Sequence, residues 1–376
     1  MNFALTEEQA LLRDSIGRYL AETQDFETAR RIMRMPNGFS RSLWQGLAEL
    51  GLPALLVAEA DGGLGASLTD AALAAEELGR HLAAIPFATS AVLAARLLAA
   101  APPASAARGL LARVAAGDRI VAVALDEPGG STGLPPVATR ALPVAGGYRL
   151  SGRKIVVVDG AIADDLLVSA DLDGTTALFH VTPDGPGLAL NRYATVDGRS
   201  AADLAIDGVV LPEDALVLGS GAAAALDDGL DAARLMLAAE ALGLMERALE
   251  LTIEHLKTRM QFGRRLSDFQ VLTHRVSEMV VRRESARSIL YRGLALAKAA
   301  PLDRGRAISA TMVRVLQSAE FIGSQAIQLH GGMGMSDEGM VGHIYKRLRV
   351  IGKTHGDLIW HMDRFIANTA DGRAVA

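Results

Sequence analysis

Cysteine is absent from the 376 residues of the chain. Its absence excludes disulfide bonds, thiolate catalysis and cysteine-ligated metals, and the chain carries no mark of an oxidising compartment. An excess of positive charge is also missing, since 38 Lys and Arg residues stand against 43 Asp and Glu residues for a net charge of −5. Without a basic stripe that would neutralise a phosphate backbone, we do not expect a nucleic-acid partner.

Long hydrophobic runs are missing as well. The apolar stretches 91–101 and 235–244 are shorter than the about 20 apolar residues that a bilayer requires, so we expect core helices and no membrane partner. The first twenty residues are acidic and amphipathic, and they lack the basic start and apolar core of a signal peptide. We therefore expect no secretion and a cytoplasmic location.

More than one domain is expected, because the chain is half apolar and its 376 residues exceed the roughly 250 to 300 residues at which single cores stop growing. A first helix is predicted after Thr6, which is a suitable N-cap with Gln9 three residues later. Further helices are predicted at 40–50, 67–82, 89–100 and 106–116. Residues 1–117 are thus expected to form an N-terminal helical domain.

The pattern changes at residue 118. Short β-rich runs separated by glycine-rich turns predict strands at 120–125, 148–150, 154–158, 165–169, 177–181 and 202–210. Residues 118–220 are therefore expected to form a small antiparallel β-barrel or sandwich. Helical patterns return at 226–257, 268–299, 304–329 and 339–368, which predicts a C-terminal four-helix bundle over 221–376. The expected fold class is mostly α with a β middle domain.

Two segments carry residues suited to a ligand. The first is the loop Arg259–Gly263 after the first bundle helix, where an arginine can donate two hydrogen bonds to a diphosphate and Phe262 offers a flat apolar face. The simpler interpretation is a helix turn with a buried phenylalanine and a solvated arginine.

The second segment, Gln328–Gly334, ends the third bundle helix. Its three glycines would let backbone amides approach a ligand closely. A glycine helix cap explains the same residues, so this segment alone is weak evidence.

Together the two segments resemble the paired signatures of the acyl-CoA dehydrogenase family. The match continues through the LTEEQALLRD start, Glu59–Gly65, Glu76–Gly79 and Gly152-x-Lys154. The resemblance implies an FAD cofactor, held partly across a subunit interface, and a tetramer or at least a dimer. Carried over by position, the residues implicated in FAD binding are Arg259, Gln261, Phe262, Gln270, Gln328, Gly331 and Gly332.

The family's chemistry implies a carboxylate that removes the α-proton of an acyl-CoA thioester, a hydride transfer to the flavin, and an electron-transfer flavoprotein as acceptor. The two usual positions of that carboxylate correspond to Gly356 and Ala233, and Arg234 beside the latter is expected to bind substrate. Glu240 is the remaining candidate. It lies about 10 Å further along the helix, and a buried carboxylate paired with an arginine is its favoured interpretation.

Neighbours of Gly356 offer two further alternatives. Asp357 would take the role if the register were off by one, but aspartate is one methylene shorter than glutamate, and His355 is more simply a structural histidine. The flavin cover also departs from the family pattern, with Val156-Val157-Val158 in place of residues that include a hydroxyl. The loop 127–132 keeps the Glu-Pro-Gly opening and lacks the usual ending.

The segment from Gln328 to Leu348 with the following His355-Gly356-Asp357 resembles one branch of the family, the small subunit of pimeloyl-CoA dehydrogenase and related bacterial subunits. In that branch a larger homologous partner can supply the catalytic carboxylate. We therefore expect an FAD-dependent acyl-CoA dehydrogenase subunit of a homo- or hetero-oligomer, a dimer of dimers. The alternatives are a non-catalytic structural subunit and a flavoprotein oxidase.

Overall fold

The computed structural model describes residues 5–129 and 137–370 of the chain. Two compact units are present, one made of Met1–Ala29, Ala72–Ala83 and Arg234–Ala376, the other of Arg30–Ala71 and Ala84–Ala233. The predicted division into 1–117, 118–220 and 221–376 follows element type and stays a prediction. Residues 130–132 of the loop singled out above lie outside the described residues.

The unit that contains the C-terminus is helical. Helix α1 begins after Thr6, whose side chain accepts from Gln9 N at 3.2 Å while Gln9 Oε1 accepts from Thr6 N at 3.1 Å, so the predicted capping box is confirmed. The helices with residues in this unit are α1 (Glu7–Thr23), the start of α2 (Phe26–Met33), most of α4 (Leu68–Arg80), α7 (Ala222–Thr258) from Arg234 onward, α8 (Gln270–Ala295), α9 (Pro301–His330), α10 (Met340–Ile351) and α11 (Leu358–Ala370).

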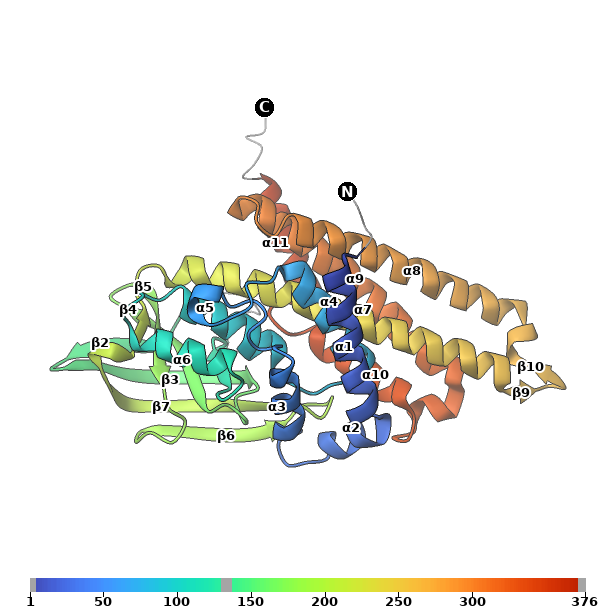
Figure 1. The fold of residues 1–376 in the computed structure, drawn as a ribbon, viewed down its shortest axis with the longest axis horizontal. Coiled ribbons are helices and arrows are strands. Elements are labelled where there is room, and N and C mark those ends of the chain that lie inside the picture. The colour runs from blue at the N-terminus through green and yellow to red at the C-terminus, as the bar shows by residue number, and fades with distance from the viewer. Residues whose placement is uncertain (1–4, 130–136, 371–376) are drawn as a thin grey trace. The chain divides into compact units, whose positions relative to one another are not determined.

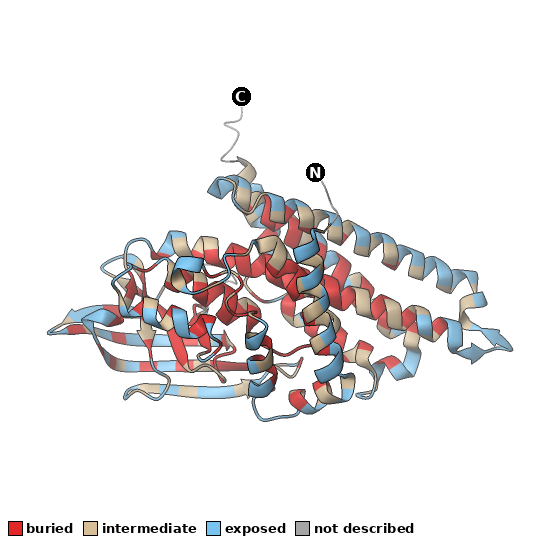
Figure 2. Cartoon of the chain, viewed as in Figure 1, coloured by how far each residue is buried: buried red, intermediate tan, exposed pale blue. Residues whose placement is uncertain are grey.

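The bundle is organised around α9, which packs against α8, α10 and α11. A short hairpin of β9 (Met260–Gln261) and β10 (Arg264–Arg265) joins α7 to α8, which run in opposite directions (Figure 1). Buried residues follow α7 and α9, whereas one side of α8 is exposed (Figure 2). Three of the four predicted long helices are continuous. The fourth is divided into α10 and α11, because His355 and Gly356 between them adopt positive φ angles of 57° and 119°.

The other unit contains an eight-stranded sheet in the order β6-β7-β3-β2-β4-β5-β8, with β1 paired to β4. Neighbouring strands of this sheet are antiparallel, except that β4 pairs in parallel with both β1 and β2. The expectation of a wholly antiparallel sheet is therefore wrong at these two pairs. Strand β3 lies between β2 and β4 in the chain and provides the crossover that a parallel pair requires. The strands are β1 (Val121–Ala124), β2 (Arg140–Val144), β3 (Gly147–Val158), β4 (Asp165–Leu172), β5 (Thr175–Val181), β6 (Leu188–Ala194), β7 (Ser200–Pro212) and β8 (Leu216–Leu218).

Helices accompany the sheet in this unit. The helix predicted at 89–100 is present as a π-helix, η2, followed by the short helix α5. The helical elements are α3 (Arg41–Glu49), η1 (Glu59–Asp61), η2 (Phe87–Ala94), α5 (Ala95–Ala99), α6 (Ala106–Ala115) and η3 (Glu213–Ala215). One apolar cluster joins Leu97 and Leu111 to Leu226, and a second fills the sheet around Leu150 and Phe179.

No helix in the described part of the chain is both long enough and apolar enough to cross a bilayer.

Candidate functional site

The two segments singled out in the sequence lie next to each other at one end of the bundle. His255, one turn before Arg259, stacks on His330, which directly precedes Gly331, with ring centroids 4.5 Å apart and planes inclined by 24°. The end of α7 and the end of α9 therefore meet within one chain. Stacking brings together residues that stand 75 positions apart in the sequence.

The hairpin after α7 displays an aromatic ring. Phe262 and Gly263 form its two-residue turn with φ angles of 54° and 77°, the conformation that matches the twist of hairpin strands. Phe262 is 86% exposed, so the simpler interpretation of a phenylalanine buried in a helix turn is wrong. The rings of Phe262 and Phe269 pack edge to face, with their centroids 6.1 Å apart. The guanidinium carbon of Arg264 lies 3.9 Å from the centre of the Phe269 ring. These contacts brace the hairpin while leaving one ring open to a ligand.

The three glycines of the second segment have different reasons to be glycine. Gly331 ends α9 with a φ of 60° and so acts as a helix cap. A Cβ at Gly334 would lie 2.7 Å from Ile327 O, which explains that glycine by packing. A Cβ at Gly332 would meet no atom within 4 Å, and its φ is not in the left-handed region. Nothing within the described chain requires glycine at this position, and the open space beside it leaves room for a ligand.

This end of the bundle suits the diphosphate half of a dinucleotide. It offers an exposed arginine for two-pronged hydrogen bonds, an exposed aromatic face and a glycine turn with open space beside it. All of the residues carried over from the family are exposed, as a bound ligand requires: Arg259, Gln261, Phe262, Gln270, Gln328, Gly331 and Gly332. The residues present therefore fit the cofactor that the sequence implies.

Glu240 is held in a buried ion pair. Its carboxylate accepts two hydrogen bonds from Arg347, one from Nε at 2.8 Å to Oε1 and one from Nη2 at 2.9 Å to Oε2. Both side chains are about nine-tenths buried, with 10% and 7% exposed. A bidentate buried pair engages both carboxylate oxygens, which agrees with the favoured interpretation of a buried carboxylate paired with an arginine, while a role of Glu240 as the base stays a prediction.

The usual base position at Gly356 is closed by neighbouring rings. A Cβ there would lie 2.5 Å from Cε3 of Trp360 and 2.9 Å from Nε2 of His361. Real Cβ atoms do not come this close to ring atoms, so any side chain at Gly356 would displace the indole. The second usual position, Ala233, is fully buried in the apolar cluster that includes Leu230. Gly356 therefore has no room for a glutamate, and Ala233 would place a carboxylate among apolar neighbours.

Arg234 is a buried residue of the helical unit and contacts two neighbours of Gly356, His355 and Trp360. It is 1% exposed, donates from Nε to the backbone oxygen of His355 at 2.8 Å, and places its guanidinium 4.5 Å from the centre of the Trp360 ring. These contacts hold the α10–α11 connection. Its predicted role in substrate binding stays a prediction.

The two residues next to Gly356 in the sequence, His355 and Asp357, are poor bases. Burial lowers the pKa of His355 to about 3, and the charge of Arg234 adds to the effect. Asp357 accepts from the backbone N–H of Trp360 at 3.0 Å and from Lys353 Nζ at 3.1 Å, contacts that lower its pKa. Bases this weak are poorly matched to an α-proton at neutral pH.

The sheet carries a strained bulge at the position predicted to face the flavin. Val156 has a φ of 50°, an outlier for a β-branched residue, where the pairing of β3 with β7 shifts register. Its N–H donates to Asp203 Oδ1 at 3.0 Å, and the Tyr193 hydroxyl donates to the same oxygen at 2.9 Å. Sequence reasoning missed Asp203, although an aspartate between the apolar residues Ala202 and Leu204 of a strand is a signal that could have found it.

The Gly152-x-Lys154 match corresponds to a buried polar network. Lys154 is fully buried and donates from Nζ to Glu127 Oε1 at 2.6 Å and to Ser169 Oγ at 2.8 Å. Glu127 also accepts backbone N–H groups from Ala138 and Thr139. The pair thus anchors the described residues on both sides of the 130–136 segment.

Comparison with known proteins places these features in one family. A sequence model for the acyl-CoA dehydrogenase N-terminal domain matches residues 6–118, and one for the acyl-CoA dehydrogenase C-terminal domain matches residues 219–358.

Relatives match along most of the chain. Acyl-CoA dehydrogenase FadE27 of Mycobacterium tuberculosis is 32% identical over 74% of this chain and 72% of its own length. Acyl-CoA dehydrogenase IpdE2 of the same organism is 30% identical over 91% of each chain. A solved structure of the ChsE4-ChsE5 complex from Mycobacterium tuberculosis superposes with a TM-score of 0.90 and 26% identity over 100% of both chains.

Proposed function

Because this chain belongs to the acyl-CoA dehydrogenase family, we propose that it is an FAD-carrying subunit acting in the α,β-desaturation of an acyl-CoA thioester. The observation that carries the proposal is the meeting of the Arg259 hairpin and the Gly331-Gly332 turn at one end of the bundle. FAD, when bound, supplies the oxidant that accepts a hydride from the β-carbon, and an electron-transfer flavoprotein is the proposed acceptor.

The residues proposed to hold the cofactor act on its diphosphate and adenosine end. Arg259 donates to phosphate oxygens, Phe262 offers its exposed ring, and Gly332 allows backbone N–H groups to come close. Gln261, Gln270 and Gln328 add exposed amides that can donate or accept. This chain's own contribution is therefore binding and orientation.

The catalytic carboxylate is proposed to come from a homologous partner subunit. Gly356 is closed by Trp360, and Glu240 is engaged by Arg347. These contacts support a division of labour in which this chain binds flavin and the partner removes the α-proton. They equally favour the second candidate function, a non-catalytic structural subunit, and flavin content separates the two.

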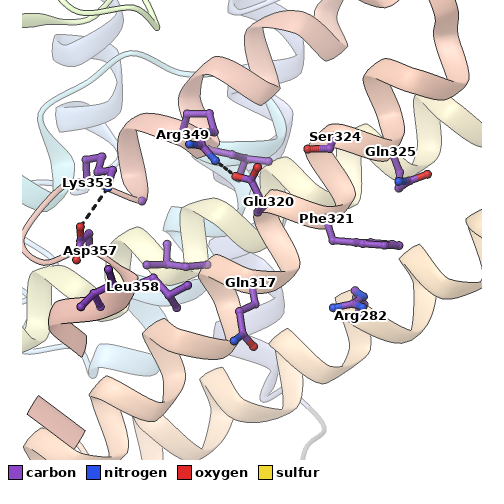
Figure 3. A pocket seen from close by; sticks show the side chains of 14 residues that line it. Arg282, Gln317, Glu320, Phe321, Ser324, Gln325, Arg349, Lys353, Asp357 and Leu358 are labelled. Atoms are coloured by element: carbon purple, nitrogen blue, oxygen red, sulfur yellow. Dashed lines mark hydrogen bonds and ion pairs between the residues drawn. The ribbon is translucent and has the colours of Figure 1, made fainter. Parts of the chain in front are cut away.

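An apolar stripe on α11 supports a partner of this kind. Ile359, Met362 and Ile366 fall on one face of the helix and are 68%, 46% and 61% exposed. Ile359 also lines a groove of about 780 Å³ formed by residues of α8, α9, α10 and α11, in which Arg349 pairs with Glu320 and Lys353 with Asp357 (Figure 3). With these charges paired, the surface is suited to a mainly apolar contact with another subunit of the same family.

Flavin binding is tested by purification from the native host and by titration with FAD. The Gly332→Ala variant is expected to bind FAD about tenfold more weakly without a change in thermal midpoint, because its Cβ meets no atom within 4 Å. Gly334→Ala is the matched control and is expected to lower the midpoint, because its Cβ would crowd Ile327 O at 2.7 Å. A protein that stays colourless in every assembly and takes up no FAD would refute the flavoprotein assignment.

The partner proposal is tested on α11. Replacing Ile359, Met362 and Ile366 together by serine is expected to release the copurifying subunit, as seen by light scattering after size-exclusion chromatography. Val281→Ser, which changes a 67% exposed valine on α8, is the control and is expected to leave the assembly intact. An unchanged assembly in the triple variant would place the interface elsewhere.

A further inference from the structure

The stacked rings of His255 and His330 stand immediately behind the two segments proposed to bind FAD. The Arg259 N–H donates to His255 O at 2.9 Å, and His330 is bonded directly to Gly331. The backbone of His255 is therefore one hydrogen bond, and the backbone of His330 one covalent bond, away from a residue proposed to contact the cofactor. Because the stack joins the ends of the two helices that lead into these segments, it bears on the distance between the segments.

The His330 ring is fixed in orientation. Its Nδ1 lies 2.8 Å from Ala326 O, one turn earlier on α9. Because a carbonyl oxygen only accepts, Nδ1 carries the proton in the neutral ring. His330 thus presents a set face to its partner.

The environment favours a neutral partner ring. Burial lowers the pKa of His255, and the neighbouring His330 and Arg259 lower it further. A neutral imidazole can stack at 4.5 Å without the repulsion that two charged rings would suffer.

We propose that His255 and His330 are a positioning pair that sets the separation between Arg259 and the Gly331-Gly332 turn, and thereby the grip of this chain on the diphosphate half of FAD. The inference rests on the proposed function, since it assumes that these two segments bind the cofactor. The pair touches neither the reacting atoms nor the substrate. It acts through the residues beside it.

The test compares ring removal with ring replacement. His255→Ala is expected to raise the Kd for FAD about tenfold in titrations of flavin-stripped protein, in whichever assembly the chain is purified. His255→Phe keeps a flat ring at the same position and is expected to restore the Kd to within about threefold of the original. His274→Ala, which changes an exposed histidine on α8, is the control and is expected to leave the Kd unchanged.

The outcomes separate this inference from the proposed function. If Arg259→Ala weakens FAD binding but His255→Ala does not, the positioning role is wrong and the flavin site stands. If the phenylalanine variant binds as weakly as the alanine variant, ring stacking is not what holds the two segments, and the inference also fails. If the original protein binds no FAD and Arg259→Ala changes nothing, the proposed function itself fails.

Discussion

At the scale of single residues, Gly356 shows how a carboxylate position becomes unusable. Trp360 lies where a side chain on Gly356 would begin, and Arg234 packs over the same ring from within the bundle. The φ of 119° at Gly356 is a second obstacle, because residues with a Cβ rarely adopt it. A glutamate at Gly356 would therefore meet both a crowded position and an unfavourable backbone conformation.

The prediction is that Gly356→Glu lowers the free energy of unfolding by about 2 to 3 kcal/mol and gives no acyl-CoA-dependent bleaching of flavin without a partner. Combining it with Trp360→Ala is expected to recover part of the stability lost to crowding. Urea unfolding and flavin absorbance measure the two effects.

Gly109→Glu provides the control, because Gly109 is exposed on α6 and a Cβ there meets nothing within 4 Å. It is expected to be neutral or slightly stabilising, since glycine is a poor helix former. A Gly356→Glu variant as stable as the control and active alone would show that the position is open.

At the scale of elements, the bulge in β3 holds a valine against its conformational preference. A left-handed conformation costs a β-branched residue about 1 to 2 kcal/mol, whereas glycine adopts it freely. Val156 is 47% exposed, so little apolar burial offsets this cost. The hydrogen bond from its N–H to Asp203 helps keep the bulge in place.

Val156→Gly is therefore expected to leave the free energy of unfolding unchanged or to raise it by up to about 1 kcal/mol. Val210→Gly is the comparison, since Val210 is 62% exposed on β7 with an ordinary strand conformation, and it is expected to lose about 1 kcal/mol. Chemical denaturation of both variants measures these changes in the free energy of unfolding. Equal losses would mean that Val156 is not strained.

Sequence patterns predicted elements best where local chemistry determines them. The capping box of Thr6 and Gln9 correctly predicted where α1 begins. Strand β3 was predicted as two pieces because Gly152 interrupts its apolar pattern, and β6 was missed because its residues are mostly exposed. The break between α10 and α11 was missed because it depends on backbone conformation at His355 and Gly356, which apolar spacing does not report.

At the scale of the whole molecule, the sequence predicted which segments form the candidate site but not what holds them together. Both motifs were found from glycine, arginine and phenylalanine spacing. The stack of His255 on His330 and the pairing of Glu240 with Arg347 join residues 75 and 107 positions apart. Such contacts follow from tertiary packing, and no local pattern encodes them.

Stability on the acid side also depends on contacts of this kind. Burial alone would raise the pKa of Asp165, but hydrogen bonds from His180 and Arg119 lower it to about 2. Asp165 thus contributes stability above its unfolded pKa near 4, and this is lost as the pH falls towards 2. His355, with a pKa of about 3, likewise resists protonation, so stability falls from about pH 6.5 downward.

Glu76 acts in the opposite direction. Burial raises its pKa to about 7, with Arg287 lowering it and Glu246 and Glu77 raising it. The unfolded chain loses this proton near pH 4.5 while the folded chain keeps it to about pH 7. Stability from this group is therefore full below pH 4.5 and is lost as the pH rises through 7.

Glu76→Gln removes the ionisation, so the variant is expected to be more stable than the original protein at pH 8, by up to about 3 kcal/mol, and equal to it at pH 4. Urea midpoints of both proteins at pH 4, 6 and 8 measure their difference in stability at each pH. The acid effects of Asp165 and His355 are common to both proteins and cancel in this difference. Glu8→Gln, at an exposed site on α1, is the control and is expected to show little change at any of the three. Only an unfavourable charge in the folded state makes the stability advantage of the variant grow with pH. A variant no more stable than the original protein at pH 8 would therefore mean that Arg287 and the other neighbours stabilise the Glu76 carboxylate adequately.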